Sequence, residues 1–196
     1  MGERTGRVDR KTNETDIRVE FSLDGQGTAS LQTGVPFLDH MLTLFAVHGF
    51  FDLTIQARGD LEIDAHHTVE DMGLCLGEAL ACAVGDRKSI RRYGEAHVPM
   101  DEACARVALD LSNRPYLVYE APPMASRVGT FETELMPEFL RALSQRGGIT
   151  LHVHVMYGSN THHTLEAVFK ALGRALDQAT QMDPRRTGVP SSKGML

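Results

Sequence analysis

The sequence predicts an α+β fold, in which an internally duplicated unit of a mixed β-sheet packed against a helix pair gives two similar halves. Strand-like and helix-like patterns follow one another in the same order in both halves of the 196-residue chain. Residues 54–80 can also be written over residues 150–176 without a gap, and a His-His-Thr-x-Glu segment recurs. Helical periodicity can repeat leucines and alanines, but it does not repeat this polar segment. The half-repeats are therefore predicted to span residues 1–98 and 99–196.

The first half begins with strand patterns. Alternating apolar residues predict three half-buried strands, at residues 17–23, 29–31 and 53–57. Helical spacing predicts a helix over residues 36–48 that ends at Gly49, and a longer helix that begins near Thr68.

The second half repeats this order. Its alternating segments predict strands at residues 107–111, 117–119 and 149–155. One helix is predicted over residues 136–143, before the glycines at 147 and 148, and a last helix begins near Thr164. Each half should therefore place its strands in one layer and its helix pair against them.

Composition excludes several classes of protein. Apolar residues make up 42% of the chain, as in a globular domain, and no apolar run is long enough to cross a membrane. The polar start does not have the character of a signal peptide. A formal charge of −6 argues against nucleic acid as a partner. Cys75, Cys82 and Cys104 lack metal-knuckle spacing and are predicted to be buried thiols in a reducing compartment, which indicates a cytoplasmic protein.

The two His-His-Thr-x-Glu segments are the strongest candidates for chemistry. On a helix, the glutamate can share a face with either histidine, while the two adjacent imidazoles diverge and can serve different metal ions. Four imidazoles and two carboxylates are available for two symmetric centres: His66, His67, Glu70, His162, His163 and Glu166.

This donor set contains no thiolate and suits manganese, iron, zinc or nickel, and spacing alone does not choose among them. One such segment could be only a polar helix start, where an acidic first turn favours the helix dipole. Two copies at equivalent positions favour a metal site. His40, on the preceding helix, is a further candidate ligand or a hydrogen-bonded helix histidine.

Other polar residues are weaker candidates. Arg91, Arg92 and Arg114 could clamp an anion or could be surface charge. Residues 190–194 have the composition of an anion-binding loop and also that of a frayed terminus. The roles of four more histidines stay open: His48, His97, His152 and His154.

Seven segments together resemble the imidazoleglycerol-phosphate dehydratase family: NET (13–15), FLDHM (37–41), DAHHTVED (64–71), PMDEA (99–103), LDLSNRPYL (109–117), HHTLEAVFKALGRAL (162–176) and PSSKGML (190–196). The similarity runs from about residue 7 to residue 196, with the motifs in family order. It implies dehydration of imidazole glycerol phosphate to imidazole acetol phosphate in histidine biosynthesis. It also implies two manganese ions per active site, other divalent metals not being excluded, and 24 identical subunits with sites between chains. No phosphatase-like segment precedes the similar region, so a monofunctional enzyme is expected.

The resemblance also assigns roles by position. The implied metal ligands are His40, His66, His67, Glu70, His162, His163 and Glu166. Glu14 would be the acid/base, and the substrate phosphate would be held by Arg92, Arg114, Ser192 and Lys193 in the C-terminal tail. Glu138 stands where many members have a further ligand histidine, and in the repeat it is the counterpart of His40. Three alternatives stay open: Glu138 binds the metal itself, one metal keeps an open position, or His152 or His154 supplies the missing nitrogen.

Two other functions compete with this prediction. A binuclear metal-dependent phosphoesterase or hydrolase would release free phosphate, but it would be expected to have aspartate-rich bridging ligands. A metal-storage or metal-dependent assembly protein would oligomerise with metal but would give no turnover, and it leaves Glu14 and the arginines without a role.

Overall fold

A computed structural model describes residues 4–196 and contains two four-stranded sheets with the same topology. The first sheet has the strand order β1-β2-β4-β3, with β1 (Thr5–Lys11), β2 (Thr15–Ser22), β3 (Ala29–Gln32) and β4 (Asp52–Gly59). The second has the order β5-β6-β10-β7, with β5 (Tyr93–Met100), β6 (Ala103–Asp110), β7 (Tyr116–Glu120) and β10 (Thr150–Tyr157). In each sheet the last pairing is parallel and the others are antiparallel. The predicted mixed sheet in each of two similar halves is confirmed.

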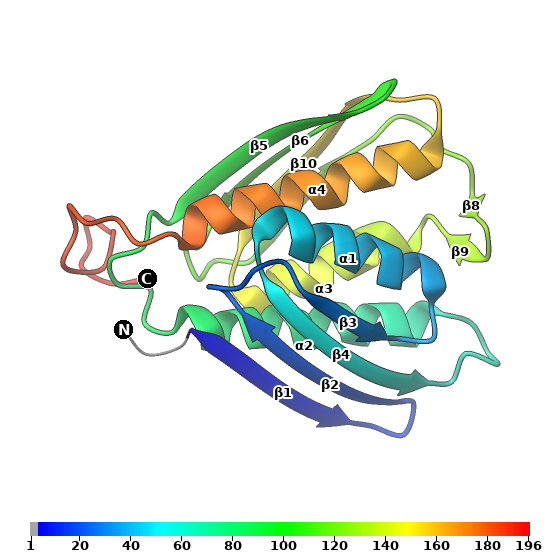
Figure 1. Cartoon of the computed structure of the whole chain (residues 1–196), viewed down its shortest axis with the longest axis horizontal. Helices are drawn as coiled ribbons and strands as arrows, with labels where there is room; N and C mark the ends of the chain where they lie inside the picture. Colours follow the sequence, from blue (N-terminus) through cyan, green and yellow to red (C-terminus); the bar gives the residue numbers. More distant parts are fainter. Residues whose placement is uncertain (1–3) are drawn as a thin grey trace.

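Four helices lie between the two sheets (Figure 1): α1 (Pro36–Gly49), α2 (His66–Val84), α3 (Leu135–Gly147) and α4 (Thr161–Thr180). The helices α1 and α2 contact the first sheet, and α3 and α4 contact the second. Across the middle of the molecule, α1 packs against α4 and α2 against α3. A short hairpin of β8 (Arg127–Val128) and β9 (Phe131–Glu132) precedes α3. Each helix pair is thus shared between the halves, which matters for the site below.

Large apolar side chains on the inward face of each sheet form the core with the helices. In β2 the alternating residues Ile17, Val19 and Phe21 are all buried, and Leu151 and Val153 in β10 are buried in the same way. Burial of such side chains stabilises the fold by about 1.5–3 kcal/mol each. This alternation is the signal from which these strands were predicted.

The edge strands β1 and β5 were not predicted, and their glycines explain why. Gly6 and Gly94 face the helices so closely that an added Cβ would lie 1.9 Å from the Ala79 carbonyl oxygen and 1.8 Å from that of Ala175. A strand with glycine at its most buried position lacks the apolar alternation that marks a half-buried strand. The second sheet begins at Tyr93, five residues before the last residue of the predicted first half, residue 98.

The duplication has a different register in its strands than in its helices. In the first sheet Thr5 pairs with Ser22, which pairs with Asp52; in the second, Tyr93 pairs with Asp110, which pairs with Thr150. Thr150 therefore corresponds to Asp52 rather than to Thr54, as the gapless alignment had it. The difference arises because residues 60–65 make a longer connection from β4 to α2 than residues 158–160 make from β10 to α4. A shift of two residues keeps the same strand face inward, so the core pattern hides it.

Two smaller expectations need correction. The first helix includes Gly49, and the left-handed residue that ends it is Phe50, with φ of 56°. All three cysteines are unpaired, but only Cys75 is buried, whereas Cys82 is exposed and Cys104 is partly exposed. Within residues 4–196, none of the helices has the length and apolar character needed to cross a membrane.

Candidate active site

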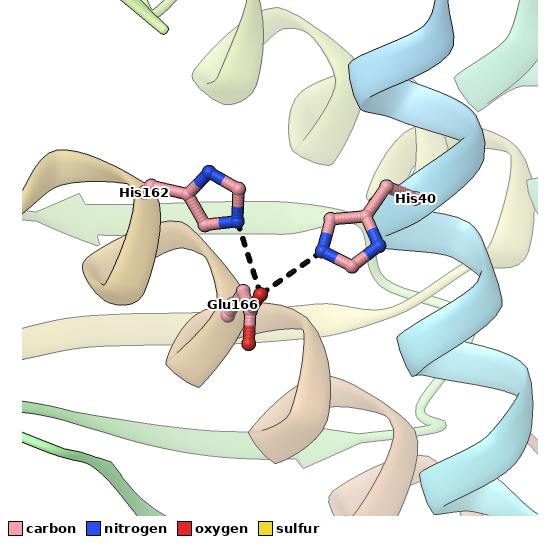
Figure 2. A group of neighbouring side chains, drawn as sticks. All are labelled: His40, His162 and Glu166. Carbon is pink, nitrogen blue, oxygen red and sulfur yellow. Dashed lines mark hydrogen bonds and ion pairs between the residues drawn. The ribbon is translucent and has the colours of Figure 1, made fainter.

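His40, His162 and Glu166 meet where α1 of the first half packs against α4 of the second (Figure 2). His162 and Glu166 are four residues apart on α4 and share one face of the helix. The Glu166 Oε1 atom lies 2.9 Å from His40 Nε2 and 3.0 Å from His162 Nε2. The imidazole of His40 therefore approaches the same carboxylate oxygen from the other half of the chain.

The Glu166 carboxylate is ionised although it is buried. Burial by itself would raise the pKa of Glu166, but hydrogen bonds from Lys170, His40 and His162 outweigh it and bring the pKa to about 2. The Lys170 Nζ atom donates to Oε2 at 2.7 Å. Lys170 was not singled out from the sequence, although it lies one helical turn after Glu166.

These three side chains fit a divalent metal ion. Their two imidazole nitrogens and one carboxylate oxygen lie within 4.8 Å of one another, and they form the one such group of three or more metal-capable side chains in residues 4–196. Imidazole and carboxylate donors without thiolate suit manganese and related ions. The donor set is therefore chemically suited to the predicted metal.

The second histidine of each pair is held by a carboxylate. The Nδ1 atom of His67 lies 2.9 Å from Asp60 Oδ2, and that of His163 lies 2.8 Å from Glu102 Oε2. These hydrogen bonds raise the pKa of each histidine, and the bond from His163 is the main reason that the pKa of Glu102 falls to about 2. Asp60 and Glu102 were not predicted from the sequence.

The two imidazoles of each adjacent pair are separate and nearly perpendicular to each other. The rings of His66 and His67 are 6.2 Å apart at 90°, and those of His162 and His163 are 6.3 Å apart at 83°. In each pair the two rings are thus well separated and differently oriented. That the two histidines of a pair serve different metal centres stays a prediction.

The counterparts of the assembled cluster remain apart. His66 Nε2 lies 3.9 Å from Glu70 Oε2, beyond hydrogen-bond distance. Glu138, on α3, is ion-paired with Arg141. A metal-ligating role for His66, Glu70 and Glu138 stays a prediction.

Glu14 lies at the turn between β1 and β2, and its side chain is 55% exposed. Its Oε1 atom is 4.0 Å from His67 Nε2. Within residues 4–196 the Glu14 carboxylate accepts no hydrogen bond, whereas its backbone N–H donates to Thr12 Oγ1. The carboxylate is thus beside a predicted metal ligand and uncommitted.

One cavity of about 360 Å³ is lined by all four residues predicted to hold phosphate, Arg92, Arg114, Ser192 and Lys193. Ser112 and Asn113 are among its other lining residues. Arg92 is buried, and its guanidinium donates to both oxygens of Asp110, at 2.6 and 3.0 Å, and to the Pro190 carbonyl oxygen. Arg114, by contrast, is largely exposed. The cavity is cationic. Arg92 binds the backbone of the C-terminal tail at Pro190, whereas Arg114 and Lys193 are more available to a ligand.

The other histidines do not join this site. His154 Nδ1 lies 3.0 Å from Glu120 on the neighbouring strand β7, and His152 lies beside it on β10. His48 and His97 line a separate cavity with Arg174, and burial lowers the pKa of His48. Neither pair belongs to the metal-capable group of the described residues.

The metal-capable cluster is at the first turn of α4, and the cationic cavity includes Arg92, which contacts the last turn; Figure 1 shows these two ends of the helix on opposite sides of the molecule. His162 is at the start of this helix, whereas the backbone N–H of Arg92 donates to the carbonyl oxygen of Ala179 at its end. With a rise of 1.5 Å per residue, the two ends of this stretch are about 26 Å apart. One chain does not bring the two groups together.

Comparisons with known proteins agree with the motifs. The family model of imidazoleglycerol-phosphate dehydratase matches residues 33–176. The imidazoleglycerol-phosphate dehydratase of Syntrophobacter fumaroxidans is 70% identical over 195 residues, covering 100% of this chain and 99% of the relative. That of Bacillus subtilis is 62% identical over 187 residues, covering 95% and 96%.

Solved structures of the same kind of protein share the fold. The crystal structure of imidazoleglycerol-phosphate dehydratase from Staphylococcus aureus superposes with a TM-score of 0.82 at 42% identity, covering 91% of this chain and 99% of that one. The structure from Pyrococcus furiosus, solved in complex with (S)-C348, gives a TM-score of 0.83 at 38% identity, with coverage of 96% and 100%. The duplicated architecture is therefore shared with these proteins.

Proposed function

We propose that this protein has a manganese-dependent active site formed by residues of more than one chain. The chain belongs to the imidazoleglycerol-phosphate dehydratase family and is a hydro-lyase of histidine biosynthesis. The observation that carries the metal proposal is the cluster of His40, His162 and Glu166, whose donor atoms lie within 4.8 Å of one another. Two manganese ions per site are proposed from the family resemblance.

The proposed ligand set extends this cluster with four residues of the paired motifs and with Glu138 of α3; the four are His66, His67, Glu70 and His163. A bound divalent cation would act as a Lewis acid on the substrate imidazole, so that the ring can accept electron density. Glu14 would take the carbon-bound proton of the glycerol chain as the C–O bond to the neighbouring hydroxyl breaks, and that hydroxyl would combine with one proton to leave as water, so that the net loss is the carbon-bound hydrogen and the hydroxyl group. The enol product would then tautomerise to the ketone. An uncommitted carboxylate beside His67 supports this role for Glu14.

The substrate phosphate would bind in the cationic cavity of Arg92, Arg114, Ser192 and Lys193. A substrate with three carbons between ring and phosphate is far too short to span the separation of about 26 Å along α4. This mismatch supports sites in which one chain supplies the metal ligands and another the phosphate cavity. Exposed apolar side chains such as Phe50, Ile63 and Tyr116 are suitable for chain contacts. We propose 24 identical subunits, by family resemblance, and a cytoplasmic location.

Chelation tests the metal proposal. We expect enzyme treated with chelator to lose turnover of imidazole glycerol phosphate and to regain it when Mn²⁺ is added back, with other divalent ions compared in parallel. The product should be a ketone that retains its phosphate, because free phosphate would indicate a hydrolase. Full activity after complete metal removal would refute the metal-dependent site.

Mixed assemblies test the proposal of sites between chains. His162→Ala and Lys193→Ala should each be inactive alone, but their co-expression should restore activity, because some sites combine an intact cluster with an intact cavity. Co-expression of His162→Ala with His40→Ala is the matched control and should stay inactive, since both residues belong to one cluster within a chain. Absence of rescue in the first mixture would show that each site comes from a single chain.

A further inference from the structure

We propose that Glu102 is the duplicated counterpart of Glu14 and has become a positioning residue for His163, whereas Asp60 positions His67 and leaves Glu14 free for proton transfer. This inference rests on the proposed metal function. It concerns how two equivalent carboxylates came to have different tasks.

The register of the two hairpins establishes the equivalence. Thr5 pairs with Ser22 at the start of the first hairpin, and Tyr93 pairs with Asp110 at the start of the second. Glu14 directly precedes β2, and Glu102 directly precedes β6. The two glutamates therefore occupy the same turn position of the repeat, beside the helix that carries the histidine pair of the same half.

Glu102 is fully engaged at the start of α4. Its Oε2 atom lies 2.8 Å from His163 Nδ1, and its Oε1 atom accepts a hydrogen bond of 2.7 Å from the backbone N–H of Asn160. Asn160 is the N-cap of α4, and its side chain accepts from the backbone N–H groups of His162 and His163. One carboxylate thus fixes both the His163 ring and the first turn of its helix.

Glu14 has no comparable bonds, because another residue has taken the place at His67. Asp60 lies in the longer connection of residues 60–65, and its Oδ2 atom is 2.9 Å from His67 Nδ1. Glu14 remains on the Nε2 side of the ring, at 4.0 Å. The second half has only residues 158–160 at this point, so it has no loop carboxylate to relieve Glu102.

The chemistry of histidine ligation gives the bonded carboxylates a purpose. An imidazole that binds a metal through Nε2 keeps its proton on Nδ1, and a carboxylate that accepts a hydrogen bond from this Nδ1–H group fixes both the tautomer and the ring orientation. Loss of such a partner typically weakens metal binding about 10- to 100-fold. Loss of an acid/base group instead lowers turnover by about 10²- to 10⁴-fold.

The test compares Glu102→Gln, Asp60→Asn and Glu14→Gln in the full-length assembled protein. Mn²⁺ dissociation constants are measured from the electron paramagnetic resonance signal of free Mn²⁺, and kcat is measured at rising Mn²⁺. We expect Glu102→Gln and Asp60→Asn to bind Mn²⁺ about 10- to 100-fold more weakly and to recover most of kcat at saturation. Glu14→Gln should bind Mn²⁺ like the wild type and lose turnover by about 10²- to 10⁴-fold at every concentration.

Two further variants make the result specific. Glu102→Asp retains a carboxylate and should recover part of the lost affinity, which also covers the case in which Glu102→Gln fails to assemble. Glu120→Gln removes a similar carboxylate from His154 Nδ1, outside the site, and should change neither quantity. Wild-type Mn²⁺ affinity in Glu102→Gln, or weakened affinity in Glu14→Gln, would overturn the division of roles. A wild-type protein that binds no Mn²⁺ would instead overturn the metal proposal beneath it.

Discussion

The two halves of the molecule share one chain path but differ at the starts of their equivalent helices, α2 and α4. In the second half, His162 and Glu166 of α4 meet His40 in a compact cluster. In the first half, His66 and Glu70 of α2 are 3.9 Å apart, and the counterpart of His40 is Glu138, bound to Arg141. Duplication thus supplied two copies of the scaffold, and a few side chains made the two sites different.

Supporting residues differ in the same direction. Lys170 neutralises Glu166 from one helical turn away, whereas the equivalent position near Glu70 is Leu74. The helix α4 has a side-chain N-cap at Asn160, but α2 begins at Ala65 without one. The second-half site is therefore organised within a single chain to a degree that the first-half site is not.

The largest expected difference between the halves is in metal affinity. His40→Ala removes a donor from the assembled cluster and should weaken Mn²⁺ binding by about 100-fold or more, beyond the usual effect of losing only a supporting residue. Glu138→Ala should have a smaller effect, because this carboxylate must leave Arg141 before it can bind a metal. Isothermal titration with Mn²⁺ measures both. Equal losses would show that the two centres are equally organised.

The next prediction concerns the edge strands β1 and β5, where equivalent substitutions should destabilise the protein equally in the two halves. Gly6→Ala and Gly94→Ala place a methyl group against a helix backbone at equivalent positions and should each destabilise the protein by about 1–3 kcal/mol. Gly188→Ala is the control, because an added Cβ there meets no atom within 4 Å. Urea unfolding measures all three. A large effect in only one half would show that the strand–helix contacts are not equivalent.

The smallest expected effect depends on pH and concerns a position that differs between the two halves. Burial raises the pKa of Cys75 in α2 to about 11, whereas the equivalent residue of α4 is Ala171. The Cys75 thiol ionises more readily in the unfolded protein than in the folded one. Its contribution to the free energy of unfolding is therefore complete below about pH 9 and is lost as the pH rises toward 11. We expect stability to fall by about 1 kcal/mol between pH 8 and pH 10 from this group.

Cys75→Ala should flatten that part of the stability profile in urea unfolding. Cys82→Ala is the matched control, since this cysteine is exposed on the same helix and its removal should leave the slope unchanged. An unaltered slope in Cys75→Ala would assign the alkaline sensitivity to another group.

Most of the fold was predictable from the sequence because its central strands and helices bury large apolar side chains at regular spacing. Phe21 and Leu151 belong to such patterns, and so do the inward faces of α2 and α4. The strands β1 and β5 escaped because Gly6 and Gly94 stand where a large residue would have revealed them. Close approach of two backbones requires the absence of a side chain, and an absence leaves little periodic signal.

The candidate site was predictable where its residues are neighbours in sequence or belong to a repeated motif. The histidine pairs and Glu166 were predicted in this way, and the structure brings three predicted ligands together. Asp60 and Glu102 were missed because their contacts depend on tertiary structure: Glu102 and His163 are 61 positions apart. The repeat did contain one clue, since Glu102 occupies the position of Glu14, but the clue appears only after the hairpins are aligned separately from the helices.

The helix α4 has a consequence for the proposed particle as a whole. Its first turn would belong to one catalytic centre and its last turn to a neighbouring one. The length of α4 would therefore set the distance between adjacent centres. Inserting one helical turn would move them apart by about 5.4 Å and rotate the surfaces that join the subunits little, since a whole turn restores their direction. The distance between neighbouring catalytic centres in the proposed assembly would thus depend on the length of a single helix.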